Sequence, residues 1–341
     1  MEKRKHLIWQ IPFLTLLIVG TVLIIAQQRN PPYRHLQGKV FGTFYHITYQ
    51  GADDLHPEIK KALDEVDNSL SPFNPRSIIT KVNENQPVKV NKMFADVFGI
   101  AQTVAKETDG AFDITVAPLV NLWGFGFKEG STPDKRTIDS LMHFVGFEKV
   151  KLLDDGHVEK THPNVMLDCS AVAKGYGSDV VAGVLDSHGV TNYMVEIGGE
   201  IVTRGVSEKR VPWRIGVSRP TDDPLQESNE FETVLNVTDK AMATSGNYRN
   251  FYYKDGKKYA HTIDPKTGHP VQHSLLSATV LADNCATADA YATSFMVLGL
   301  EKARAVVERH PELMAYLIYA GPDGKYQTWF SPTLQDKILG D

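Results

Sequence analysis

The side chains of this sequence that could carry chemistry lie in several short stretches rich in Gly, Asp, Thr and Ser. One of them places Asp289 and Thr293 four residues apart. On a helix this spacing puts both side chains on one face, where a carboxylate and a hydroxyl could hold a hard cation. Mg²⁺ prefers such oxygen ligands and completes its shell with substrate phosphates. The alternative is an Asp in the first helical turn and a Thr that bonds back to its own helix.

A general base is sought among the histidines, because imidazole titrates near neutral pH. His261 is the best candidate, since it opens a stretch that ends in a Pro- and Gly-containing turn at Gly268. Most of the other histidines lack polar, Gly-rich neighbours. A structural role for His261 is the open alternative.

Three more stretches could bind a ligand. In the first, Asp168 ends an apolar run just before a predicted helix, where free backbone N–H groups favour anions. Asp168 or Ser170 could equally cap that helix, and the two interpretations are compatible. The pair Gly198-Gly199 permits close approach of a ligand or makes a hairpin turn. The stretch from Gly110 combines polar and aromatic residues that suit a planar ligand, or a tight turn with a capping Asp.

Several functional classes lose ground. The sequence has no Gly-x-Ser-x-Gly, Walker or His-Glu-x-x-His motif, which disfavours hydrolase, kinase and zinc-protease interpretations. A net charge of −5 without a clustered basic excess gives no nucleic-acid footprint. Cys169 and Cys285 are too few for a disulfide framework and are not spaced as a zinc site; whether they pair is left open.

The elements that must position these residues are a mixture of helices and strands. The chain has 341 residues, 42% hydrophobic and 23% charged, as is usual for globular domains. Periodicity and end signals predict helices at Pro57–Leu70, Lys92–Thr108, Ala171–His188, Ala286–Leu298 and Glu301–His310. β-branched and aromatic runs predict strands at Lys39–Tyr49, Val165–Asp168, Asn192–Ile197, Leu275–Ala282, Tyr316–Tyr319 and Tyr326–Phe330. Strict βαβ alternation is missing, so we predict an α+β fold with mixed sheets and packed helices.

The N-terminus predicts a membrane anchor. Residues 1–6 form a basic head, and residues 7–26 are largely apolar over a length of about 30 Å, enough to cross a bilayer. The basic head should stay in the cytoplasm, which places the rest of the chain outside the cytoplasmic (inner) membrane, on its periplasmic side. A cleaved signal peptide is the alternative, but Ile24 is large for the −3 position. Residues 27–37 are expected as a linker and residues 38–341 as the catalytic domain.

Taken together and in this order, the stretches resemble the ApbE family, the FAD:protein FMN transferases, from about Gly38 to the C-terminus. Together they are far more specific than any one alone. The motifs are FGT from Phe41, DGAFDITVAPLVNLWGFG from Asp109, LDCSAVAKGY from Leu167, EIGGEI from Glu196, ATSGNY from Ala243, HTIDPKTGHPV from His261 and ADAYATSFMVLG from Ala288.

The resemblance implies an FAD pocket and a Mg²⁺ site. The FAD pocket would be lined by Phe41, Phe73, Ala111, Phe112, Asp113, Asp168, Lys174 and Ile263. The metal would be held by Asp289, Thr293 and the backbone carbonyl of Ala171. Many members carry a second Asp where this chain has Ala292, and many are lipoproteins rather than helix-anchored proteins.

The activity that the resemblance implies is transfer of FMN from FAD to a Thr, sometimes Ser, hydroxyl of an acceptor protein, with release of AMP. Acceptors in such systems are typically subunits of membrane redox complexes. An FAD pyrophosphatase and a non-catalytic flavin-binding protein are the alternatives. The acceptor, the oligomeric state and the preference between Mg²⁺ and Mn²⁺ are left open.

Overall fold

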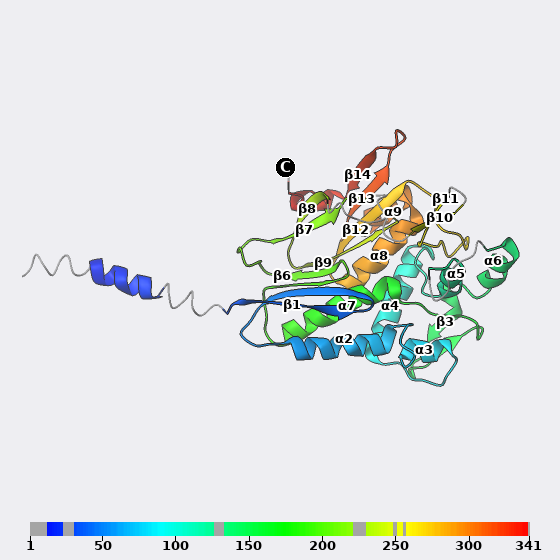
Figure 1. The fold of residues 1–341 in the computed structure, drawn as a ribbon, viewed down its shortest axis with the longest axis horizontal. Helices are drawn as coiled ribbons and strands as arrows, with labels where there is room; N and C mark the ends of the chain where they lie inside the picture. Colours follow the sequence, from blue (N-terminus) through cyan, green and yellow to red (C-terminus); the bar gives the residue numbers. More distant parts are fainter. Residues whose placement is uncertain are drawn as a thin grey trace, which may run out of the picture.

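A central antiparallel sheet organises the fold (Figure 1). The computed structural model describes residues 12–22, 31–125, 133–220, 230–247, 251–254 and 257–339. In spatial order the sheet consists of β1 (Tyr33–Val40), β2 (Thr43–Gln50), β5 (Tyr193–Ile197), β6 (Glu200–Arg204), β9 (Lys240–Gly246), β12 (Leu275–Ala282), β13 (Met314–Ala320) and β14 (Tyr326–Phe330). The α+β class is confirmed. The expected mixed pairing is wrong, because all neighbours in this sheet pair antiparallel and several are joined directly as hairpins.

Helices cover one face of this sheet. They are α2 (His56–Leu70), α4 (Lys92–Glu107), α7 (Ser170–Ser187), α8 (Cys285–Leu298) and α9 (Leu300–Arg309), close to the predicted ranges. A core of aromatic, aliphatic and small side chains joins α4, α7, α8 and α9 to β9, β12 and β13. A second core joins α2 and α7 to β2 and β5. The two helices that carry the LDCSAVAKGY and ADAYATSF motifs therefore lie against each other and the sheet.

The opposite face of the sheet is covered by a hairpin and the C-terminal segment. The hairpin is β7 (Trp213–Ser218) with β8 (Phe231–Val237), and the segment is the 3₁₀ helix η2 (Pro332–Lys337). Their apolar side chains form a third core with β6, β9, β12 and β13. The molecule therefore has three layers, with the sheet in the middle (Figure 1).

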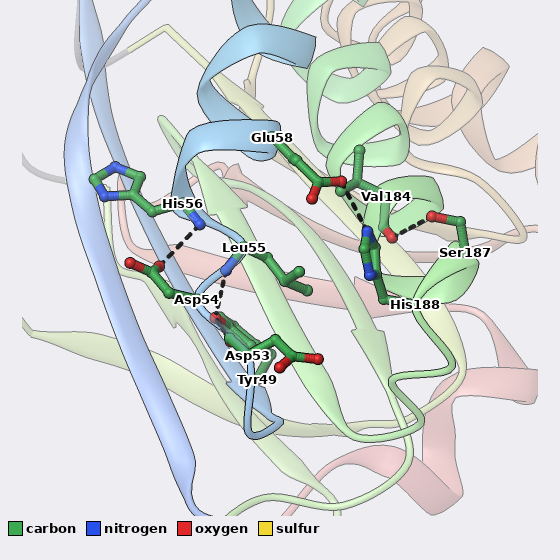
Figure 2. A network of polar contacts seen from close by, with 9 residues as sticks. All are labelled: Tyr49, Asp53, Asp54, Leu55, His56, Glu58, Val184, Ser187 and His188. Atoms are coloured by element: carbon green, nitrogen blue, oxygen red, sulfur yellow. Dashed lines mark hydrogen bonds and ion pairs between the residues drawn. The ribbon is translucent and has the colours of Figure 1, made fainter.

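The start of α2 is tied to both β2 and α7 (Figure 2). The Tyr49 hydroxyl accepts the Leu55 N–H at 3.1 Å and donates to the Asp53 carbonyl at 2.8 Å. On the other side of the helix, His188 Nε2 lies 2.8 Å from Glu58 Oε2. The N-cap residue Leu55 provides no side-chain cap, but Asp54 Oδ1 accepts the N–H of His56, the first residue of α2, at 3.1 Å.

Two predicted strands differ from the observed ones. The run Lys39–Tyr49 is split into β1 and β2 by a two-residue turn, Phe41-Gly42, with φ of 51° and 73°. Strand β1 begins at Tyr33, inside the range expected as a linker. The segment Val165–Asp168 is buried at Val165 and Leu167 but is no strand, for a reason given below.

Short elements complete the described part of the fold and were not predicted. They are α3 (Ile78–Asn83), α5 (Ala117–Leu122), α6 (Lys135–Met142), the 3₁₀ helix η1 (Phe147–Lys149), and the hairpins of β3 (Val150–Leu152) with β4 (Val158–Lys160) and β10 (Phe251–Lys254) with β11 (Lys257–Ala260). Their sequences are too short for periodicity to identify them.

The N-terminal anchor is not supported. Among the described residues, no helix combines the length and apolar character that crossing a membrane requires. Residues 12–22 are helical; the basic head and the rest of the predicted span at 7–26 lie outside the described residues. The question of a disulfide is answered, since Cys169 and Cys285 are both free and buried.

Candidate active site

A cavity of about 1060 Å³ gathers the predicted site residues from distant parts of the chain. It lies where the β1–β2 turn, the β5–β6 turn and the starts of α7 and α8 meet the loops after α2 and α4. The predicted residues that line it are Phe41, Phe73, Ala111, Phe112, Asp113, Asp168, Ala171, Lys174, His261, Ile263, Asp289 and Thr293. Their individual roles stay predictions, but their assembly in one cavity is a property of the fold.

Phe41 enters the cavity wall from a strained turn. Its φ of 51° is unusual for a bulky residue, and with Gly42 it forms a two-residue hairpin of the type that needs positive φ at both positions. A Cβ on Gly177 of α7 would lie 2.7 Å from the Phe41 ring, so the ring packs directly on this glycine. The strained turn directs the Phe41 ring towards α7, and the absence of a side chain at Gly177 leaves space for the ring at the cavity wall.

Asp113 organises the loop after α4. Its Oδ1 accepts the Thr115 N–H at 2.7 Å and the Thr115 hydroxyl at 2.6 Å, and the same hydroxyl accepts the Gly146 N–H at 2.7 Å. Burial raises the pKa of Asp113 to about 6, against the Thr115 hydrogen bonds that lower it. The carboxylate therefore holds the loop while lining the cavity.

Asp168 is placed by an extended segment that another side chain supports. Asn83 accepts the Leu167 N–H at 2.7 Å and donates to the Leu167 carbonyl at 2.9 Å. The amide side chain thus takes the place of a neighbouring strand, which is why Val165–Asp168 forms none. Asp168 Oδ1 then accepts the Ser170 N–H at 2.8 Å. Asp168 therefore supports the start of α7 and lines the cavity, while anion binding at this helix start stays a prediction.

Helices α7 and α8 cross in close contact. A Cβ on Gly175 would lie 2.4 Å from the Cys285 carbonyl oxygen. Asp179 of α7 accepts the N–H groups of Cys285 and Ala286 at 2.7 and 2.8 Å, which caps α8 from the neighbouring helix. Burial raises the pKa of Asp179 to about 6, although these two hydrogen bonds lower it. The crossing fixes the relative position of the first turns of both helices.

This crossing forms a set of oxygen donors. Asp289 is buried, and its Oδ2 accepts the Gly175 N–H at 3.1 Å. In a regular helix the Gly175 N–H would donate to the Ala171 carbonyl. Because it also donates to Asp289, its hydrogen bond to the Ala171 carbonyl oxygen is weakened. Thr293 stands one turn beyond Asp289, and the described residues provide no hydrogen bond to its hydroxyl. The alternative interpretation, in which the Thr293 hydroxyl bonds back to its own helix, is therefore not observed among the described residues.

These donors fit a hard cation. The carboxylate, hydroxyl and carbonyl are the ligand types that Mg²⁺ takes, with few protein carboxylates. Burial raises the pKa of Asp289, which outweighs the opposing effects of the Lys174 ammonium and the Gly175 N–H. Within the described residues no group of three or more His, Cys, Asp or Glu side chains could hold a metal.

An ion pair between a buried carboxylate and a partly exposed ammonium lies beside these donors. Lys174 Nζ is 2.5 Å from Glu200 Oε1, and the Glu200 side chain is only 3% exposed. Glu200 Oε2 is buried and has no hydrogen-bond partner, although Glu200 lines the cavity. Burial alone would lower the pKa of Lys174, but the Asp289 and Glu200 carboxylates raise it above its usual value.

His261 lies at the end of the cavity formed by α5 and the following turn. Its ring is in edge contact with Phe125 at 6.4 Å between centroids. The turn after it is tied to α5 and α6, because Trp123 Nε1 donates to the Gly268 carbonyl at 2.8 Å and a Cβ on Gly268 would meet Ile138 at 2.7 Å. The imidazole is therefore attached to a fixed turn.

Glu200, Asp179 and Asn83 were missed by sequence reasoning. Glu200 lies within the EIGGEI motif and was given no role; its signal was a charged residue directly before the apolar pair Ile201-Val202 at the start of β6. Asp179 and Asn83 act across 106 and 84 residues of sequence, and no local pattern marks them.

The comparisons with known proteins agree with this geometry. A model of the ApbE family matches residues 41–318. The chain belongs to the ApbE family. The FAD:protein FMN transferase of Escherichia coli (strain K12) is 35% identical over 319 residues, which cover 90% of this chain and 89% of that protein. The flavin transferase ApbE from Vibrio cholerae superposes with a TM-score of 0.81 at 36% identity, covering 90% of this chain and 99% of that one. The apo form of the Pseudomonas stutzeri flavinyl transferase ApbE has a TM-score of 0.81 at 28% identity, covering 92% and 99%.

These similarities make the chain an ApbE-family flavin transferase. The interpretation as a non-catalytic flavin-binding protein is thereby set aside.

Proposed function

We propose that this chain moves FMN from FAD to a Thr or Ser hydroxyl of an acceptor protein, uses Mg²⁺, and releases AMP. The observation that carries the proposal is the convergence of aromatic rings, oxygen donors and an imidazole on one cavity. Its volume of about 1060 Å³ is at the upper end for ligand pockets, as a dinucleotide needs. The names of the relatives support FAD as the donor.

The cavity offers different chemistry to the two ends of FAD. Phe41 and the largely exposed Phe73 provide aromatic surface for the planar ring system. Lys174 and the start of α7 provide positive charge and N–H groups for the pyrophosphate. These residues would bind and orient the nucleotide so that the phosphate of its FMN half faces the acceptor.

Asp289, Thr293 and the Ala171 carbonyl would hold the cation. A bound Mg²⁺ would stabilise negative charge on the pyrophosphate as a Lewis acid. Removal of one donor should therefore lower kcat more than it weakens flavin binding. Asp289→Ala is expected to abolish transfer and to retain FAD; normal turnover of this variant at limiting Mg²⁺ would contradict the assignment.

His261 is the proposed general base. A Thr hydroxyl is a poor nucleophile until its proton is removed, and imidazole can accept that proton near neutral pH. The hydroxyl oxygen forms a bond to the phosphorus of the FMN half, the bond from this phosphorus to the AMP oxygen breaks, and the hydroxyl proton moves to His261. AMP leaves, and the flavin remains on the acceptor as a phosphoester.

The setting of the reaction rests on sequence alone. The basic head and apolar residues 7–26 support a catalytic domain held on the outer side of the cytoplasmic membrane. Acceptors there would be subunits of membrane redox complexes. Extraction of the protein from washed membranes, by detergent but not by high salt, would test the anchor.

Mass spectrometry tests the proposed reaction. A Thr-containing acceptor domain is incubated with the full chain, FAD and Mg²⁺. A mass gain of one FMN on the threonine, lost on addition of EDTA, is expected. Free FMN and AMP without modified acceptor would instead favour an FAD pyrophosphatase, and unchanged FAD would contradict both activities.

A further inference from the structure

The ion pair of Lys174 with Glu200 has a role that the proposed reaction leaves unassigned. Glu200 begins β6 directly after the Gly198-Gly199 turn, and its side chain reaches Lys174 on the first turns of α7. The contact is short, at 2.5 Å, and lies on the cavity wall. Removing the Glu200 carboxylate from water is costly, so a pair at this place needs a reason other than stability alone.

The pair is electrostatically incomplete. A buried carboxylate normally has its remaining lone pairs satisfied by hydrogen bonds. Glu200 Oε2 has no partner, although the residue is only 2% exposed. With both carboxylates ionised, Lys174, Glu200 and Asp289 carry one positive and two negative formal charges. Burial opposes this state, since it raises the pKa of Glu200 to about 8 and that of Asp289 above its usual value. A cation that enters the cavity would stabilise the ionised carboxylates.

Two carboxylates, those of Glu200 and Asp289, interact electrostatically with the Lys174 ammonium. The carboxylates of Asp289 and Glu200 both raise the pKa of the Lys174 ammonium. Yet among the described residues the ion pair of Lys174 is made with Glu200, and none is formed with Asp289. Asp289 accepts the Gly175 backbone N–H instead, which is a neutral donor and does not cancel its charge.

We propose that Glu200 is a positioning residue that holds the Lys174 ammonium away from Asp289 and so keeps Asp289 available to a divalent cation. The inference rests on the cation site of the proposed function and gives Glu200 a role in keeping that site available. Without the Glu200 charge, Asp289 is the remaining carboxylate beside the partly exposed Lys174 ammonium. Lys174 then pairs with Asp289 and competes with the cation for it.

Binding of Mn²⁺ alone to the full chain tests this without any turnover. Mn²⁺ replaces Mg²⁺ because both accept oxygen ligands and free Mn²⁺ is measured directly by electron paramagnetic resonance. Glu200→Gln, which keeps the shape and removes the charge, should weaken Mn²⁺ binding about tenfold. Glu301→Gln, the same change in an exposed ion pair on α9, should leave it unchanged.

A double-mutant cycle separates positioning from a simple loss of negative charge. If Glu200 acts through Lys174, Glu200→Gln should change Mn²⁺ affinity less than about twofold in a Lys174→Met background. Equal losses in both backgrounds would overturn the proposal, and so would wild-type affinity in Glu200→Gln. Lys174→Met by itself should bind Mn²⁺ at least as tightly as the wild type, which keeps the test valid if Glu200→Gln folds poorly.

The same Mn²⁺ measurements distinguish an error in the proposed cation site from an error in the role of Glu200. If the wild-type chain binds no Mn²⁺, the proposed metal site is wrong and the inference falls with it. If the wild type binds Mn²⁺ and the cycle shows no coupling, the metal site stands and Glu200 has no positioning role.

Discussion

Adding one methyl group at Gly175 should disturb the cation site much more than the stability of the fold. The substitution Gly175→Ala places a Cβ 2.4 Å from the Cys285 carbonyl oxygen, 2.7 Å from its carbon and 2.9 Å from the Ala286 nitrogen. All three are backbone atoms, so no rotamer change relieves the contact. An ordinary contact starts at 3.4 Å, and the start of α8 must therefore move by about 1 Å.

The expected size of the effect follows from two opposing contributions. Ala in place of Gly in a helix gains about 0.5–1 kcal/mol. Overpacking of a close contact costs about 1–3 kcal/mol, and here Asp179 resists the movement through its bonds to Cys285 and Ala286. We expect a net loss of about 1–2 kcal/mol in the free energy of unfolding. Because Asp289 moves with α8, a shift of about 1 Å should lower kcat roughly 100-fold.

The assays are urea unfolding and steady-state transfer to a Thr-containing acceptor. Gly183→Ala is the matched control, since Gly183 lies on the same helix, is exposed, and has nothing within 4 Å of an added Cβ. It should gain stability and keep its kcat. A Gly175→Ala variant with unchanged stability and kcat would refute the view that this crossing positions the cation site.

Three further substitutions test other parts of the site. Burial raises the pKa of Asp113 to about 6, so the folded state holds this proton more tightly than the unfolded chain; stability should fall as pH rises from about 4 to about 6, by about 3 kcal/mol. Asp113→Asn keeps an oxygen for Thr115 and should flatten this part of the pH profile of urea unfolding; an unchanged slope would contradict the assignment. Asp179→Ala removes the acceptor of the Cys285 N–H and should cost about 2 kcal/mol in the same assay. His261→Ala should lower kcat by roughly 100- to 10,000-fold while FAD affinity, followed by fluorescence, is retained; an undiminished kcat would remove His261 from the base role.

The helices could be predicted because their signals are local. Helix α7 shows this: an apolar stripe at i, i+4 spacing from Val172 marks its length, and Gly189 marks its end. In the structure α7 spans Ser170–Ser187, and Gly189 has φ of 70°. Each of these signals needs only residues within a few turns of one another.

The strands were harder, because their backbone partners lie far away in sequence. Val165–Asp168 has the composition of a buried strand, yet the Leu167 N–H and carbonyl are both bonded to the Asn83 side chain, 84 residues away. The β1–β2 turn was missed for another reason. A turn with positive φ at both positions favours Asn-Gly, whereas this chain has Phe41-Gly42. The unfavourable residue hid the turn, and the strain it brings is the mark of a functional position.

The cavity shows what a sequence can and cannot say about a site. The resemblance to the ApbE family identified individual residues of the binding site, and all of them line the one cavity. Glu200 had a weaker signal of its own, as a carboxylate between a Gly pair and the apolar Ile201-Val202. A carboxylate at such a position either reaches water or needs a cation, and periodicity cannot decide between the two. The cation is Lys174, which belongs to a different motif; pairing the unassigned charges of separate motifs is therefore the step that would have found it.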